Sequence, residues 1–417
     1  MRKPKWFIVF LAAILLTSAY VSSTKAQVNT TALTTQTPPE GSIIVPDDYA
    51  TIQDAVDNAS AGGTVFVKNG VYSEPIEIHK PLTLLGEDSQ NTILDMPQIK
   101  YEPYAAIVIA ANNVTVSGFT IKNSNIGIAL ESDFPGPEGL RYPLGCKITG
   151  NNFINNSGGV ASFYGSYLTL SGNNFTENDN GIYQHSSSNN TISSNNITNN
   201  RSAGIYVVEC TNVTIKGNNI TGNGLNNGGE VGGIWVYGGG PFNICENNIT
   251  DNYVGIQFQW CNNSTVNQNN IQRNRIGIEF LNVEESGEYH LGSGNTVYSN
   301  NFIANSQQVL INKEYWLLWN YSALIINGTD TVSWDNGTTG NYWSNYNGID
   351  NNGDGIGDTP YVIDENNTDH YPFMSAVTIS TPNLEQISPL TIATIIGMAT
   401  IILVVVVYAY RVHRKIQ

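Results

Sequence analysis

Short runs of apolar and β-branched residues, separated by Gly, Asn and Ser, recur at a fixed interval through the middle of the chain. The tripeptide Asn-Asn-Ile or Asn-Asn-Phe begins at Asn151, Asn173, Asn195, Asn218, Asn247, Asn269 and Asn300. A second mark, Gly followed by Ile or Val, runs in phase with it at Gly127, Gly159, Gly181, Gly204, Gly233, Gly255 and Gly277. Both marks recur in steps of 22 residues, and the longer steps contain insertions near 222–232 and 283–295.

A unit of this length is too short for a pair of helices, and its composition is typical of short strands with turns. One unit therefore forms one coil of three strands, which pair with the neighbouring coils at a spacing of about 4.8 Å. The repeat predicts an all-β fold, a right-handed parallel β-helix with coils of about 22 residues. Equal coils also predict an inward ladder, in which the first Asn of each pair donates its amide to the next.

The two ends of a solenoid need caps. Residues 42–45 predict a strand, and apolar positions at helical spacing in residues 49–59 predict a short helix laid over the first coil. Aromatic residues predict a plug at the other end of the repeats. They are Tyr315, Trp316, Trp319, Trp334, Tyr342, Trp343 and Tyr346.

Both chain termini carry targeting patterns. Residues 1–26 begin with basic residues, continue with a short apolar core and end in Ala26, which favours a cleaved signal peptide over an uncleaved anchor. Residues 390–410 are uncharged, long enough at about 1.5 Å per residue to cross a bilayer of about 30 Å, and followed by a basic tail. Under the positive-inside rule, this pattern predicts a single-pass cell-membrane protein whose β-helix lies on the extracellular face.

The predicted organisation follows from these patterns. It comprises a signal peptide (1–26), a Thr/Pro-rich linker (27–41), the β-helix with its N-terminal cap (42–310), a C-terminal cap (311–378), a stalk (379–389), a transmembrane helix (390–410) and a cytoplasmic tail (411–417).

Charge narrows the range of partners. The chain has a formal net charge of −16, and the part predicted to be exported holds 34 acidic and 11 basic residues. Nucleic acid is excluded as a partner because its binding needs a basic footprint. Asn-x-Ser/Thr acceptors on an exported chain indicate a glycosylated surface. The candidate acceptors are Asn113, Asn174, Asn196, Asn212, Asn219, Asn248, Asn320, Asn327 and Asn336.

The four cysteines, Cys146, Cys210, Cys245 and Cys261, are too few to frame a fold of this length. Cys210 and Cys261 hold the same repeat position two coils apart, which predicts a Cα separation of about 9–10 Å. A disulfide tolerates about 7 Å at most. These cysteines are therefore predicted to be free.

Segments near both ends of the repeat region resemble a known family. Residues 44–56 (Ile-Val-Pro-Asp-Asp-Tyr-Ala-Thr-Ile-Gln-Asp-Ala-Val) and 70–74 (Gly-Val-Tyr-Ser-Glu) resemble the opening of pectin-methylesterase-like and NosD-like β-helices. Residues 340–346 (Gly-Asn-Tyr-Trp-Ser-Asn-Tyr), followed by 350–361, resemble the C-terminal signature of NosD-like surface proteins. The resemblance covers about residues 42–374. It implies a periplasmic, copper-related role in maturing a copper enzyme, and related β-helices bind or cleave polysaccharides.

The segment 350–358 has the spacing of a calcium loop. Its candidate ligands are Asp350, Asn352, Asp354, the carbonyl of Ile356, and Asp358. Position 12 of the loop is Tyr361 in place of the usual Glu, so an Asp/Asn/Gly turn without an ion stays an alternative. Calcium is the predicted cofactor. Copper is not, because copper sites use His, Cys and Met, and the histidines here are scattered.

A catalytic centre is not evident in the pattern. Polygalacturonase-like β-helices carry Gly-His-Gly and Arg-Ile-Lys marks, which this chain lacks. Asp251 and Arg273 both lie four residues before a repeat glycine and should therefore stack one coil apart. Such a lone pair is more often structural than catalytic.

The strand after each repeat glycine predicts a ligand surface. Residues two and four positions beyond the glycine should point outward, because side chains alternate along a strand. The candidate glycan-binding residues are Phe163, Tyr183, Tyr206, Trp235 and Tyr237, with Gln257 and Glu279 beside them. Ordinary stacking of β-formers, or coverage by the inserted loop near Asn226, is the alternative.

These patterns favour a non-catalytic cell-surface protein that binds glycans or serves as an envelope or adhesion component, with a calcium-stabilised C-terminal cap. A polysaccharide-modifying enzyme is the first alternative. A NosD-like copper-related maturation factor is the second.

Overall fold

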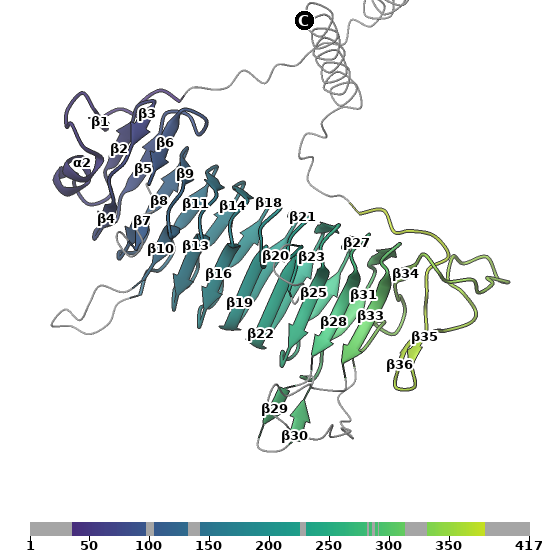
Figure 1. Ribbon diagram of the computed structural model, residues 1–417. Helices are drawn as coiled ribbons and strands as arrows, with labels where there is room; N and C mark the ends of the chain where they lie inside the picture. Colours follow the sequence, from purple (N-terminus) through teal and green to yellow (C-terminus); the bar gives the residue numbers. More distant parts are fainter. Residues whose placement is uncertain are drawn as a thin grey trace, which may run out of the picture. The chain divides into compact units, whose positions relative to one another are not determined.

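Strands of two to six residues stack in register into three long parallel sheets in the computed structural model (Figure 1). The structure describes residues 36–96, 104–131, 142–225, 231–281, 283–285, 288–290, 292–312 and 332–379. The predicted signal peptide, transmembrane helix and cytoplasmic tail lie outside these residues. Within them, no helix is long and apolar enough to cross a membrane.

The three sheets have 11, 11 and 10 strands. Sheet A contains β1 (Ile43–Val45), β2 (Thr64–Val67), β5 (Thr83–Gly86), β8 (Thr115–Ser117), β11 (Lys147–Thr149), β14 (Thr169–Ser171), β17 (Thr191–Ser193), β20 (Val213–Lys216), β23 (Phe242–Cys245), β26 (Thr265–Asn267) and β31 (Thr296–Tyr298). Sheet B contains β3 (Gly70–Tyr72), β6 (Thr92–Asp95), β9 (Thr120–Lys122), β12 (Asn152–Ile154), β15 (Asn174–Thr176), β18 (Asn196–Thr198), β21 (Asn219–Thr221), β24 (Asn248–Thr250), β27 (Asn270–Gln272), β32 (Asn301–Ile303) and β34 (Tyr342–Trp343). Sheet C contains β4 (Ile76–Ile78), β7 (Ala105–Ile109), β10 (Ile126–Leu130), β13 (Gly158–Phe163), β16 (Asn180–His185), β19 (Ile205–Cys210), β22 (Ile234–Gly239), β25 (Val254–Gln259), β28 (Ile276–Leu281) and β33 (Gln307–Asn312).

The chain visits sheets A, B and C in turn and then begins the next coil. Each residue pairs with its counterpart one unit later, so that Asn152 aligns with Asn174 and Asn174 with Asn196. Parallel strands joined in this way connect in a right-handed sense. The predicted β-helix and its 22-residue register are confirmed.

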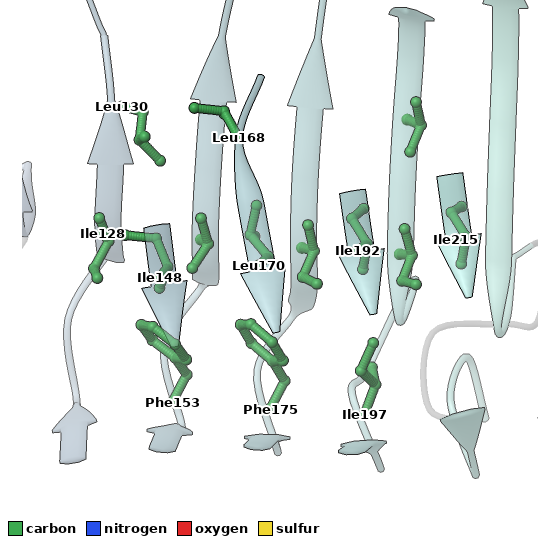
Figure 2. Packing of buried hydrophobic residues seen from close by; sticks show 14 of the residues in the cluster. Ile128, Leu130, Ile148, Phe153, Leu168, Leu170, Phe175, Ile192, Ile197 and Ile215 are labelled. Carbon is green, nitrogen blue, oxygen red and sulfur yellow. The ribbon is translucent and has the colours of Figure 1, made fainter. Parts of the chain in front are cut away.

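Inward side chains of equivalent coils stack to form the core (Figure 2). Phe153 of β12 and Phe175 of β15 lie parallel, with ring centroids 4.8 Å apart. The aliphatic residues Ile148, Leu170 and Ile192 of sheet A are equally buried. Each buried aliphatic or aromatic side chain contributes about 1.5–3 kcal/mol of transfer free energy. A coil of a different length would move its side chains out of this stack, so burial in the core favours a fixed coil length.

The predicted ladder of asparagines is present at one corner of the coil. Asn151 donates its Nδ2 to Asn173 Oδ1 at 3.3 Å, and Asn173 donates to Asn195 at 3.1 Å. A second inward ladder, which the sequence analysis missed, lies five residues further along each unit. Its members are Asn156, Asn178, Asn200, Asn223, Asn252, Asn274 and Asn305.

The N-terminal cap contains the predicted helix, and part of the predicted aromatic plug is described at the C-terminal end. The helix α2 (Ile52–Asn58) buries Ile52, Ala55 and Val56, and the side chain of Thr51 caps its N-terminus. At the other end Trp334 and Trp343 are buried. The predicted plug residues Tyr315, Trp316 and Trp319 lie outside the described residues. Two antiparallel hairpins join the fold, β29 (Val283–Glu285) with β30 (Glu288–His290), and β35 (Tyr361–Asp364) with β36 (Asn367–Asp369).

All four cysteines are buried and free, as predicted. Cys210 aligns with Gly239 of the next coil, and the backbone N–H of Asn262 bonds to that glycine from the coil beyond. Cys210 and Cys261 are therefore two coils apart. Burial raises the pKa of the Cys210 thiol to about 11 and that of Cys261 to about 12, so both stay protonated at neutral pH.

Candidate functional site

The outward rows of sheet C hold the residues predicted to bind a ligand. In the first row Tyr183, Tyr206 and Trp235 are direct neighbours on β16, β19 and β22. In the second row Phe163 pairs with His185 one coil later, and Tyr237 lies two residues after Trp235. We call Phe163, Tyr183, Tyr206, Trp235 and Tyr237 the aromatic strip.

The rings of the aromatic strip contact one another from coil to coil. The ring centroids of Phe163 and Tyr183 are 5.6 Å apart, and those of Tyr183 and Tyr206 are 5.3 Å apart. Tyr206 and Trp235 stack at 4.1 Å with only 5° between their planes. All five side chains are half-buried. The predicted register of the strip is therefore present, and the stacked rings hold one another in place.

Polar groups flank the N-terminal half of the aromatic strip. His185 lies 6.4 Å from the ring of Tyr183, and its Nε2 is 3.9 Å from a carboxylate oxygen of Glu209. Burial, and then the neighbouring Tyr183 and Tyr237, raise the pKa of Tyr206 to about 12. Its hydroxyl therefore stays a hydrogen-bond donor across the physiological range. Tyr164, which packs against His185 at 6.0 Å, was not predicted because it lies in a turn with no repeat signal.

Two residues of the predicted site are not exposed beside the strip. Gln257 and Glu279 continue the first row, but they are only 3% and 7% exposed. Gln257 donates its Nε2 to a carboxylate oxygen of Glu279 at 2.7 Å. Burial raises the pKa of Glu279, and the hydrogen bond from Gln257, which lowers the pKa, only partly offsets this effect. Strand alternation fixes the direction of a side chain and not its exposure. The prediction that Gln257 and Glu279 are available to a ligand beside the aromatic residues was therefore wrong.

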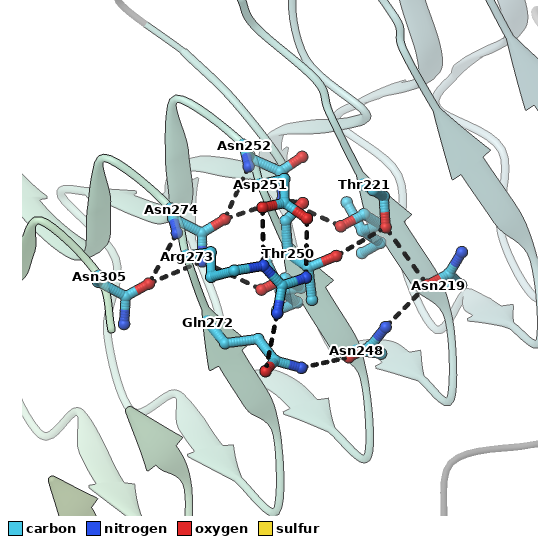
Figure 3. Close-up of polar contacts among 12 residues, drawn as sticks. Asn219, Thr221, Asn248, Thr250, Asp251, Asn252, Gln272, Arg273, Asn274 and Asn305 are labelled. Atoms are coloured by element: carbon cyan, nitrogen blue, oxygen red, sulfur yellow. Dashed lines mark hydrogen bonds and ion pairs between the residues drawn. The ribbon is translucent and has the colours of Figure 1, made fainter. Parts of the chain in front are cut away.

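Asp251 and Arg273 stack one coil apart, as predicted (Figure 3). The guanidinium donates to both carboxylate oxygens, from Nε at 3.0 Å and from Nη2 at 2.8 Å. Both side chains are about half exposed, at 53% and 46%. The groups drawn around them in Figure 3 are amides and hydroxyls. This arrangement is that of a structural ion pair on the turn between sheets B and C.

The candidate glycosylation sites fall into two environments. Asn174, Asn196, Asn219 and Asn248 form an outer ladder on sheet B, in which each Nδ2 donates to the preceding Oδ1 at 2.8–2.9 Å. Glycans on adjacent coils would collide at a spacing of about 4.8 Å. Three other acceptors are exposed and lie in turns: Asn113, Asn212 and Asn336. Asn320 and Asn327 lie outside the described residues.

The segment 350–358 is a turn held by hydrogen bonds between its side-chain oxygens and its own backbone N–H groups. The carboxylate of Asp350 accepts hydrogen bonds from the N–H groups of Gly353 at 2.7 Å and Gly355 at 2.9 Å. These bonds, that from Gly355 first, lower the pKa of Asp350. Asn352 and Asp354 accept from the backbone two residues ahead. Each of these oxygens has a further lone pair, so the same side chains could coordinate calcium while they keep the backbone hydrogen bonds.

Calcium binding by this turn stays a prediction. Adding calcium at about 100 times its dissociation constant should stabilise the folded chain by about 2.7 kcal/mol, and chelation should reverse the rise in melting temperature. Asp354→Asn keeps an acceptor for the Ile356 N–H but removes a charge, so this variant should fold and lose the calcium response. An unchanged melting temperature at millimolar calcium in the parent chain would leave the segment as a turn only.

Copper ligands do not converge in the described part of the chain. No group of three or more His, Cys, Asp or Glu side chains that could hold a metal ion occurs there. His370 pairs with Asp335 at 3.0 Å in the C-terminal cap, far along the chain from His79 and His185. The donor set therefore does not fit a copper centre within these residues.

Comparison with known proteins supports the fold and identifies a family model. The model described as periplasmic copper-binding protein (NosD) matches residues 56–238 and 223–348. An alginate lyase from Paenibacillus superposes with a TM-score of 0.50 at 13% identity, covering 62% of this chain and 94% of the lyase. A lacto-N-biosidase from Eubacterium ramulus gives a TM-score of 0.47 at 12% identity, over 62% of this chain and 63% of that enzyme. No curated protein matches the sequence. At 13% identity the alginate lyase is evidence for the fold alone.

Proposed function

The chain belongs to the family described as periplasmic copper-binding protein (NosD), and from its β-helix we propose that it is a non-catalytic surface protein that binds glycans along the aromatic strip. The stacked pair of Tyr206 and Trp235, continued by Tyr183, carries this proposal. Flat aromatic rings in a row offer apolar faces to the C–H faces of consecutive sugar units. Each ring buried against a ligand contributes on the order of 1 kcal/mol or more.

The scaffold supports a binding role because it is rigid. Every strand of sheet C that carries the strip lies between two neighbours, and the rows behind it are packed into the core. Ile182, Ile205 and Ile234, on the inward side of three of these strands, are fully buried. A preorganised surface loses little conformational entropy when a ligand binds.

A non-catalytic role is favoured by the titratable groups near the strip. Glu279 is buried against Gln257, and Glu209 lies beside His185 at 3.9 Å. Asp251 is engaged by Arg273 on another surface of the coil. Each of these three carboxylates is therefore placed beside an amide, an imidazole or a guanidinium.

The proposed placement is at the cell surface, with residues 390–410 as the membrane anchor. Support for it comes from the uncharged run and the basic tail that follows. Recovery of the full-length chain from the soluble fraction of cells would contradict the proposal that residues 390–410 anchor it in a membrane.

The function is tested with Trp235→Ala in the full-length, detergent-solubilised chain. A glycan array first identifies a ligand, and titration calorimetry then compares variants. We expect binding to weaken about five- to tenfold, the equivalent of about 1 kcal/mol or slightly more, because one ring of the strip is lost. Tyr298→Ala, which removes an aromatic ring from sheet A, should leave binding unchanged.

Two results would contradict the proposal. If Trp235→Ala binds every glycan as the parent does, the strip is only stacked β-structure. If the parent chain shortens an oligosaccharide that it binds, as seen by mass spectrometry of the products, the protein is an enzyme.

A further inference from the structure

The outer face of sheet C carries acidic side chains but neither Lys nor Arg in the rows that hold the aromatic strip. From β4 to β33 the first row contains Glu77 and Glu279 but neither Lys nor Arg. From β13 to β28 the second row likewise holds neither Lys nor Arg, and its one ionisable base, His185, lies beside Glu209. These statements cover the described residues of the two rows.

Further carboxylates lie at the margin of the strip. Glu209 is exposed at the end of β19, beside His185. Glu131 follows β10 directly, in line with Phe163 of the next coil. Burial raises the pKa of Glu131, and Glu77 raises it further, which means that the two carboxyl groups repel each other. The net charge of the whole chain, −16, has the same sign.

Such a face is unsuited to a polyanion. Proteins hold sugar carboxylates and sulfates with Arg or Lys, which supply charge-assisted hydrogen bonds. The face of an aromatic ring is itself electronegative, so it attracts cations and C–H groups rather than anions. Within a Debye length of about 8 Å, Glu209 and Glu131 would repel each acidic sugar that reached the strip.

We infer that the aromatic strip selects sugar chains without negative charge and discriminates against polyuronates and sulfated chains. This inference rests on the proposed glycan-binding function and adds the chemical class of the ligand. The similarity to an alginate lyase does not conflict with it, because at 13% identity that likeness concerns the fold.

The test uses the full-length, detergent-solubilised chain and an array of hexasaccharides that are neutral, amine-bearing or uronate. At low salt we expect uronate chains to bind about two- to fivefold more weakly than neutral ones, the size of effect that exposed charges produce. Uronate binding as tight as neutral binding would overturn the inference and leave the proposed function intact. Absence of binding to all three classes would overturn the proposed function itself.

A charge-reversal pair separates the local effect from net charge. Glu209→Lys should raise binding of uronate hexasaccharides about fivefold and leave neutral chains unchanged. Glu177→Lys is the matched control, since Glu177 is also exposed and has a similar positive φ, 60° against 49°. It lies before β16, on the turn from sheet B, away from the strip. Equal gains in the two variants would overturn the inference, because they would trace the effect to total charge.

Discussion

Asn269→Ala should lower the free energy of unfolding by about 3–5 kcal/mol, because each buried polar group left without a partner costs about 1–3 kcal/mol. The side-chain oxygen of Asn269 accepts from both the backbone N–H and the Nδ2 of Asn247, each at 2.9 Å. Its own Nδ2 donates to the carbonyl of Ile244 at 2.8 Å. Asn269 is fully buried, so water cannot replace it. Urea unfolding followed by circular dichroism measures the loss.

The adjacent residue provides the control. Asn270 aligns with Asn248 of the outer ladder, is half-exposed, and accepts one bond from Asn301 at 2.7 Å. Water can take over that bond, so Asn270→Ala should cost no more than about 1 kcal/mol. Neither residue begins an Asn-x-Ser/Thr acceptor, so glycosylation does not confuse the comparison. Equal losses in the two variants would show that the inner ladder has no special role in stability.

The fold could be predicted because equal coils force equivalent residues to stack. Once Asn151, Asn173 and Asn195 recur every 22 residues, their amides must lie one strand spacing apart. The same arithmetic placed Tyr183, Tyr206 and Trp235 in one row. The pairing register of the strands follows directly from the period of the repeat, and that period can be read from the sequence.

Exposure could not be predicted in the same way. Gln257 and Glu279 follow Trp235 in the same outward row, yet they are buried and bonded to each other. Whether an outward side chain meets solvent depends on what packs over it, and a strand pattern holds no information on that. The second asparagine ladder was predictable from the same period, because Asn156, Asn178 and Asn200 recur as regularly as the first ladder, five residues later.

The repeat glycines mark the coil period in the sequence, and the structure gives the physical reason for them. A Cβ atom on any of the seven would lie 2.4–2.7 Å from the carbonyl oxygen of the equivalent residue in the next coil. Real Cβ atoms do not approach a backbone oxygen so closely, and the oxygen cannot move without breaking the stacking of sheet C. The glycines therefore allow close approach of coils, which explains why they occur in phase with the asparagines.

Gly159→Ala should consequently destabilise the chain by about 3 kcal/mol, the upper end of the usual cost of overpacking. The added methyl group would lie 2.4 Å from the oxygen of Gly181 and 2.6 Å from Cδ1 of the buried Phe175. Gly158→Ala is the control, because a Cβ atom there meets only Cγ1 of Ile126, at 3.6 Å, and the residue does not have a positive φ. The control should keep or slightly raise the melting temperature, since alanine restricts the unfolded chain more than glycine does. Thermal unfolding of the two variants, one residue apart, measures the difference directly. If Gly159→Ala melts with the parent, neighbouring coils can separate at this corner, and the Gly-Ile/Val mark reflects turn formation rather than close packing between coils.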